Sequence, residues 1–144
     1  MEYQKAQANG ESFAVQGSDG IGKTVETIAV ATTLTAADSG KEFLLTAAAG
    51  AAITLPAVMA GWNAKFRVNL AFITTDWTIV SATDVIEGYA SVNYATVVAA
   101  NENTISFVAT AETIGDWVEI VCDGTSFNVY GVGNSTGAIT FTAP

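Results

Sequence analysis

A glycine-rich segment near the start of the chain carries the clearest chemical motif. Residues 17–24, GSDGIGKT, match the phosphate-binding pattern G-x-x-x-x-G-K-T at every required position. Such a loop binds phosphate when it joins a buried strand to a helix, because loop amides and the helix N-terminus then surround the phosphate oxygens. The next residues, VETIAVATTL, are rich in β-branched side chains, which disfavour a helix. The sequence therefore predicts a glycine-rich turn rather than a nucleotide site.

Acid–base and metal chemistry have few candidate residues. The chain has no histidine and one cysteine, Cys122, which excludes Ser-His-Asp triads and zinc sites built from histidine or paired thiolates. Two pairs of acids are close in sequence, Glu112 with Asp116 and Glu119 with Asp123, and paired carboxylates can hydrolyse glycosides. Acidic β-proteins commonly contain such pairs. We expect no catalytic residue, no metal and no cofactor, and a carboxylate-dependent glycosidase is the least favoured alternative.

Aromatic side chains are the remaining candidates for a binding function. The five candidates are Trp62, Trp77, Trp117, Phe127 and Tyr130. They could form a sugar-binding platform, although such residues more often anchor a core or an interface. Phe127 alternates in phase with Val129, which favours the core. Trp117 lies opposite to the apolar face of its own segment, so we expect it at a subunit boundary. Cys122 lies in an apolar run and is predicted to be a small buried residue.

Charge is scarce and unevenly distributed. Half of the 144 residues are apolar and 13% are charged, against roughly 25% in ordinary soluble domains. We expect much of the surface to be buried in an oligomer or larger assembly; the alternative is a monomer coated in Thr, Ser, Ala and Asn. The net charge is −9, and no Lys or Arg follows Arg67, so a basic footprint for nucleic acid is lacking.

The segments that must position these residues are short strands separated by turn signals. Phe66, Val68, Leu70 and Phe72 alternate along 65–72 and are predicted to share a buried face. Asp123-Gly124 predicts a hairpin. The other predicted strands cover 25–35, 42–46, 51–55, 77–81, 91–99, 104–109, 117–122, 127–131 and 138–142. Many short strands predict an all-β domain over 25–144, either a β-sandwich or a jelly-roll-like barrel.

The first 24 residues differ from the rest. They are polar and rich in glycine, with one short apolar run at 13–15. We predict an extended N-terminal arm, 1–24, that needs a partner surface to become ordered. No signal-peptide pattern is visible, and no apolar stretch is long enough to span a bilayer, so we expect a soluble protein made in the cytoplasm, with no membrane partner.

Two segments together resemble small virion proteins of tailed bacteriophages, especially head decoration (cement) proteins. The first is DSGKEFLL at 38–45, followed by AAGAAITLP at 48–56; the second is GDWVEIVCDGTSFNVYG at 115–131. The turn pattern D-G-T-x-aromatic within the second segment recurs in phage structural proteins. This chain departs from the usual form, because Phe127-Asn128 stands where an aromatic pair is common.

The resemblance implies a non-enzymatic subunit, commonly trimeric, on the outer surface of a phage head. It would bind the major capsid protein and bridge its subunits against internal DNA pressure, after synthesis in the host cytoplasm. No nucleic-acid partner is expected. The alternative is a receptor- or carbohydrate-binding module of a phage fibre or tail. The predicted partner contacts are Lys5, Phe13, Lys23, Trp62, Trp117 and Tyr130.

Overall fold

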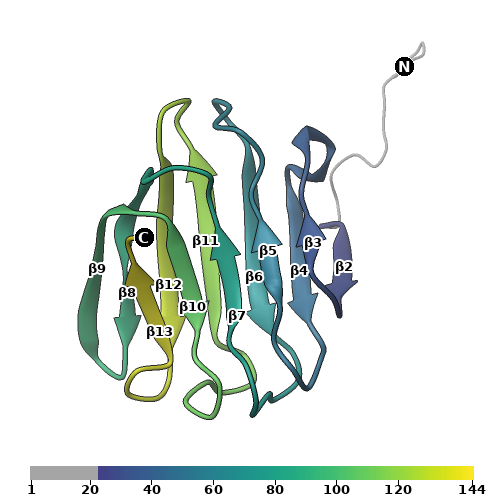
Figure 1. The fold of residues 1–144 in the computed structure, drawn as a ribbon, viewed down its shortest axis with the longest axis vertical. Helices are drawn as coiled ribbons and strands as arrows, with labels where there is room; N and C mark the ends of the chain where they lie inside the picture. Colours follow the sequence, from purple (N-terminus) through teal and green to yellow (C-terminus); the bar gives the residue numbers. More distant parts are fainter. Residues whose placement is uncertain (1–22) are drawn as a thin grey trace, which may run out of the picture.

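Two β-sheets packed face to face make up residues 23–144, the part of the chain that the structure, a computed structural model, describes (Figure 1). The seven-stranded sheet has the order β2 (Val25–Ile28), β4 (Lys41–Leu45), β6 (Asn63–Val68), β11 (Trp117–Cys122), β12 (Phe127–Gly133), β8 (Ile86–Val92) and β9 (Ala95–Glu102). The five-stranded sheet has the order β13 (Ile139–Thr142), β10 (Thr104–Phe107), β7 (Trp77–Val80), β5 (Ala52–Thr54) and β3 (Thr32–Thr33). One short 3-10 helix, η1 (Ala36–Asp38), precedes β4. The all-β sandwich predicted from the sequence is confirmed.

The first half of the described chain coils between the sheets. From β2 to β8, each strand lies in the sheet opposite to the one before it. As a result β2, β4 and β6 run parallel in one sheet, and β3, β5 and β7 run parallel in the other. Parallel neighbours need a crossover connection, and here a strand of the opposite sheet supplies it. A jelly roll is built from antiparallel strands, so the sandwich is the predicted form that is observed.

The second half is built mainly from antiparallel pairs. The strand pairs β8–β9 and β11–β12 are hairpins, and β10 pairs with both β7 and β13. One parallel pair, β12 with β8, joins the two hairpins. Gly88 of β8 pairs with Val129 there and lies at a register shift of the neighbouring β8–β9 pair. Its φ is +124°, and a Cβ atom would meet the Val129 carbonyl oxygen. Only glycine fits that close approach.

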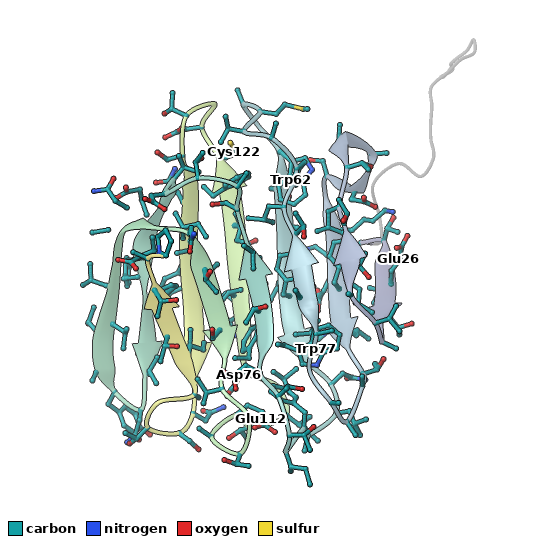
Figure 2. All side chains as sticks on the ribbon, in the orientation of Figure 1. Glu26, Trp62, Asp76, Trp77, Glu112 and Cys122 are labelled. Atoms are coloured by element: carbon teal, nitrogen blue, oxygen red, sulfur yellow. The ribbon has the colours of Figure 1, made fainter. Side chains whose placement is uncertain are left out.

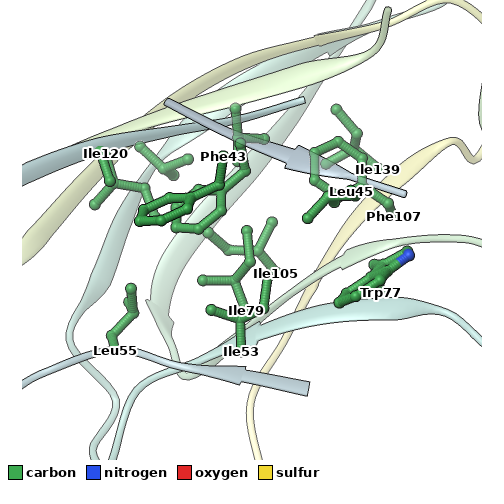
Figure 3. Close-up of a cluster of buried hydrophobic side chains, with 14 of the residues drawn as sticks. Phe43, Leu45, Ile53, Leu55, Trp77, Ile79, Ile105, Phe107, Ile120 and Ile139 are labelled. Carbon is green, nitrogen blue, oxygen red and sulfur yellow. The ribbon is translucent and has the colours of Figure 1, made fainter. Parts of the chain in front are cut away.

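The core lies between the sheets and follows the alternation of the strands. On β6, Ala64, Phe66 and Val68 point inward and are buried. Figure 3 shows side chains from both sheets meeting in this layer, including Phe43 of β4 and Ile79 of β7. Phe43 stacks on Phe66 with ring centroids 5.4 Å apart. Cys122 and Phe127 are buried, as predicted from the sequence. The hairpin at Asp123-Gly124 is also confirmed.

Three predicted strands differ from those observed by more than two residues at one end or in their division. The strand predicted over 65–72 ends at Val68, so Leu70 is 43% exposed although Phe72 is still buried. The strand predicted over 25–35 is divided into β2 and β3. The strand predicted over 91–99 is a hairpin, because the chain turns at Asn93 and Tyr94, whose φ angles are +48° and +66°. Asparagine is favoured at positive φ but tyrosine is uncommon there, so Asn93-Tyr94 is only half of a turn signal.

Trp62 belongs to the core rather than to a surface. Its side chain is 1% exposed, and its ring meets Phe127 edge-on with centroids 6.1 Å apart. The indole Nε1 donates a hydrogen bond to the Thr35 carbonyl oxygen at 3.0 Å. The sequence predicted Trp62 as a partner contact, and this burial corrects that prediction. Lys5 and Phe13, with most of the predicted arm, lie outside the described residues.

Candidate functional site: two outward sheet faces

The outer face of the five-stranded sheet has no charged side chain at its strand positions, among the strands that the structure describes. Because successive side chains of a strand point to opposite sides, the register with buried Ile53, Ile79 and Ile105 identifies the outward residues. They are Thr33, Ala52, Thr54, Thr78, Val80, Thr104, Ser106, Thr140 and Thr142. We call these residues the hydroxyl face.

The hydroxyl face is organised in rows that cross the sheet. Thr54 lies beside Val80, Val80 beside Thr104, and Thr104 beside Thr142. Cross-strand pairs of threonine contribute roughly 0.2–1 kcal/mol each to a sheet. Soluble domains usually intersperse charges of both signs over such a face, whereas the cores of protein interfaces are depleted in charge. The hydroxyl face shares this depletion of charge.

The outer face of the seven-stranded sheet carries charges over β4 and β6. The Arg67 Nε donates to a Glu42 carboxylate oxygen at 2.8 Å, and the Arg67 Nη2 donates to the same oxygen. Glu42 is 9% exposed, so this pair is largely removed from water on the carboxylate side. Lys65 lies beside Glu42 and extends toward β11.

Next to these charged residues, three aromatic side chains lie on the same face, one on each of the neighbouring strands β11, β12 and β8. The rings of Trp117 and Tyr130 meet edge-on with centroids 5.6 Å apart, and those of Tyr130 and Tyr89 do so at 5.2 Å. Tyr130 and Tyr89 are 43% and 48% exposed. The Lys65 Nζ lies 4.3 Å from the centroid of the Trp117 ring, a cation–π contact. We call Trp117, Tyr130 and Tyr89 the aromatic band.

The structure brings together two of the predicted partner contacts, Trp117 and Tyr130. Lys23 is exposed just before β2, at the other end of the described strand order. Tyr89 is a member of the band that sequence reasoning missed. The alternation of Glu87, Tyr89 and Ser91 could have indicated it, had the strand been predicted to begin at Ile86 rather than near Ser91.

A hollow of about 100 Å³ adjoins the aromatic band on this face. Its lining residues are Ser91, Asn93, Tyr94, Val132, Gly133 and Asn134. Val132 and Ser91 lie in the same cross-strand row as Trp117, so the hollow continues from the band. The turn that forms one wall is fixed by two hydrogen bonds: the Asn93 N–H donates to the Gly133 carbonyl at 2.9 Å, and the Asn93 Nδ2 donates to the Thr136 hydroxyl at 2.7 Å.

The first candidate pair of acids, Glu112 and Asp116, holds loops together. Asp116 is fully buried and accepts hydrogen bonds from the backbone amides of Thr113, at 2.8 Å, and Asn134, at 2.9 Å. Glu112 accepts from the Phe72 amide at 3.0 Å. Figure 2 shows Glu112 near Asp76, at the end of the sandwich opposite to Trp62 and Cys122. These bonds tie the loops at that end to one another.

In the second pair, Asp123 shapes a turn and Glu119 points to solvent. One Asp123 carboxylate oxygen accepts from the amides of Ser126 and Thr125, at 2.8 and 2.9 Å, and from the Thr125 hydroxyl. These hydrogen bonds, that from the Ser126 amide first, hold the pKa of Asp123 far below its usual range. Glu119 lies on β11 beside Tyr130 of the aromatic band.

Within residues 23–144, no group of three or more His, Cys, Asp or Glu side chains is arranged to hold a metal ion. The described chain also has no helix long and apolar enough to cross a membrane. Of the phosphate-loop motif, Lys23 and Thr24 are described, and strand β2 follows them where a nucleotide site needs a helix.

Comparison with protein-family models, curated proteins and solved structures finds no match for this chain.

Proposed function

We propose that the protein is a non-enzymatic decoration protein of a phage head, which binds the outer surface of the shell and bridges capsid subunits. The observation that carries this proposal is the hydroxyl face. An entire sheet face without charge can be covered by a protein partner without removing an ion from water, which is the costliest part of burying a polar surface.

The dimensions and chemistry of the hydroxyl face suit a flat protein partner. Five strands about 4.8 Å apart make a face roughly 20 Å across. Threonine hydroxyls such as those of Thr54 and Thr104 can donate and accept hydrogen bonds across a contact, and their methyl groups add apolar area. Low charge over the whole chain, 13% of residues, supports extensive contact in an assembly.

The proposed mechanism is mechanical. A subunit that binds two neighbouring capsid proteins opposes their separation, because at least one of its two contacts must break before they can move apart. Assembly of the protein as a homotrimer would multiply these contacts and raise the avidity for the shell. The major capsid protein is the proposed partner, and no catalytic step is required.

Binding to heads that lack the protein tests the proposal. Thr54 is exposed on β5, and Thr54→Lys places one charge in the hydroxyl face. We expect about a tenfold loss of co-sedimentation with undecorated heads, because the ammonium would have to be desolvated in the contact. Thr27→Lys is the matched control, since Thr27 is an exposed threonine on β2 of the other sheet. Equal binding by Thr54→Lys and the wild type would refute attachment through this face.

The aromatic band favours a second candidate, a receptor- or carbohydrate-binding module of a phage fibre or tail. Imaging of intact particles separates the two candidates. Density of the protein on the head lattice supports decoration and would report the local symmetry, whereas density restricted to the tail supports the second candidate.

A further inference from the structure

We propose that the aromatic band and the adjoining hollow form a saccharide-binding site on the face opposite to the hydroxyl face. The site goes beyond head decoration and does not depend on where in a virion the protein lies. It leaves one face for assembly and the other for a soluble or surface-bound glycan.

The aromatic rings supply the stacking surface. Tyr130 meets both Trp117 and Tyr89 edge-on. Tyr130 and Tyr89 are exposed, whereas Trp117 is half-buried and has the Lys65 ammonium over its ring. The apolar C–H side of a sugar ring stacks on such a surface. The band crosses three adjacent strands, a span of roughly 10 Å, which is about the length of two linked sugar rings. Neighbouring ring planes are inclined at 67° and 72°, so successive sugar units meet rings of different orientation, and an oligosaccharide of two or more units spans the band.

Polar groups border the rings and select a hydroxyl-rich ligand. Glu119 lies beside Tyr130 in one cross-strand row, and Asn128 lies in the next row on β12. An apolar protein partner would have to strip water from the Glu119 carboxylate without replacing its hydrogen bonds, which is unfavourable. Sugar hydroxyls can donate to that carboxylate and to the carbonyl oxygen of the Asn128 amide, whose nitrogen donates to Asp123, while the rings remain stacked.

The hollow extends the site beyond the band. Ser91, Asn93 and Asn134 are among its lining residues. The side-chain amide nitrogens of the two asparagines donate to Thr136 and Asp116, which fixes these side chains in place. A volume of about 100 Å³ suits one polar substituent of a sugar ring rather than a protein side-chain cluster. Because Trp117, Val132 and Ser91 share one row, a sugar stacked on the band can direct a substituent into the hollow.

Tyr94 at the rim is an independent sign of a ligand. It occupies a turn position with φ of +66°, where a bulky side chain is strained and glycine is preferred. Its side chain is 102% exposed, so no packing within the described chain offsets that strain. The hydrogen bonds of Asn93 to Gly133 and Thr136 hold the turn in this conformation, and residues held in such strained conformations cluster at ligand sites. Tyr94 beside the hollow is positioned to close over a bound sugar.

Tryptophan fluorescence of the full-length protein gives a direct test. The chain has three tryptophans; Trp62 and Trp77 are buried, so a ligand on the surface changes mainly the emission of Trp117. The probes are maltohexaose, cellohexaose and N-acetylchitohexaose, each titrated with fluorescence and calorimetry. We expect at least one to bind and to change the emission. Tyr130→Ala should weaken that binding about tenfold, because it removes the central ring.

Tyr94→Gly is the second variant, because it relieves the strain of the turn and should fold well. We expect it to weaken binding of the same probe severalfold. Val121→Ala, on the same face of β11 but outside the band, is the control and should bind as the wild type does. The proposal is overturned if none of the three probes binds, or if Tyr130→Ala and Tyr94→Gly both retain wild-type affinity.

The saccharide titrations give a result that is independent of the head-binding test of decoration. Thr54→Lys should retain saccharide binding even where it loses binding to heads. If Tyr130→Ala instead lowers binding to heads while no probe binds the wild type, the band is a protein contact and the saccharide site is refuted.

Discussion

The two outward faces of the sandwich are built by the same alternation but carry opposite chemistry. The hydroxyl face holds threonine, serine, alanine and valine, with no ion at any of its described strand positions. The other face carries the Glu42–Arg67 pair, Lys65 and the aromatic band. The low charge of this chain is therefore not spread evenly. Charged side chains are absent from the described strand positions of one outer face, whereas the other outer face carries ions and specific side-chain contacts.

This difference predicts different responses to mutation. Contacts on the seven-stranded sheet are specific pairs, so single substitutions there should change the stability of the isolated protein. Contacts between neighbours on the hydroxyl face are small and interchangeable, so substitutions there should alter assembly but leave the isolated fold almost unchanged.

The largest effect is expected from Arg67→Ala, which leaves the Glu42 carboxylate poorly hydrated and unpaired. We expect the free energy of unfolding to fall by about 2 kcal/mol, less than for a fully buried pair because Arg67 is partly exposed. Urea unfolding followed by circular dichroism measures it. Thr104→Ala on the hydroxyl face is the comparison and should cost no more than about 0.5 kcal/mol. Equal losses of unfolding free energy in the two variants would show that the two faces do not differ in their contribution to stability.

Tyr94→Gly should act in the opposite direction. The turn then becomes Asn-Gly, the pair preferred where two successive residues have positive φ. We expect the free energy of unfolding to rise by about 0.5–1 kcal/mol, since the strain removed exceeds the added entropy of glycine in the unfolded chain. Tyr94→Ala keeps the Cβ atom and should give no gain. Thermal unfolding of both variants checks the prediction. A gain in stability for Tyr94→Ala would show that the aromatic ring, rather than the positive φ, causes the strain.

The hairpin that joins β11 and β12 should depend on pH through Asp123. Its pKa is lower in the folded protein than in the unfolded chain, so its contribution is complete above the unfolded value, about 4, and is lost as the pH falls toward the folded value. Asp123→Asn should therefore be less stable than the wild type at pH 7, and the difference in stability between the two proteins should become smaller below about pH 4. Melting temperatures from pH 7 to pH 3 test this; a constant gap would contradict it.

The smallest effect is expected from Lys65→Met. The substitution removes the cation from the Trp117 ring but keeps an apolar side chain of similar length, so we expect a loss of about 0.5 kcal/mol. The emission of Trp117 should change, whereas Lys23→Met, at the other end of the described strand order, should leave it unaltered. Unchanged emission in Lys65→Met would show that the contact is absent in solution.

Much of the local structure could be predicted because alternation is a short-range property. Strand β11 has the bounds predicted for it, with Val118, Ile120 and Cys122 inward and Trp117 outward. The strand predicted over 65–72 was too long because the pattern continues through Leu70 after pairing has ended at Val68. Periodicity identifies a face, but it does not say where a neighbouring strand stops.

The binding surfaces were less predictable. Trp62 and Trp117 are the same residue type, yet the first is buried against Phe127 and the second is half-buried on the outer face of β11. Tyr89 joins Tyr130 only because β8 pairs parallel to β12. At the turn, Asn93 is a residue type that favours positive φ and Tyr94 is one that disfavours it. The sequence there therefore resembles a continuous strand.

By itself the sequence determined an all-β chain, its inward and outward residues along several strands, the turn at Asp123-Gly124 and the scarcity of charge. These follow from interactions among residues close in the chain, where a period of two and turn preferences suffice. The tertiary structure decided which strands became neighbours. That pairing gathered the threonines of five separate strands on one face and three aromatic rings on the other, because the side chains in a cross-strand row come from distant parts of the chain.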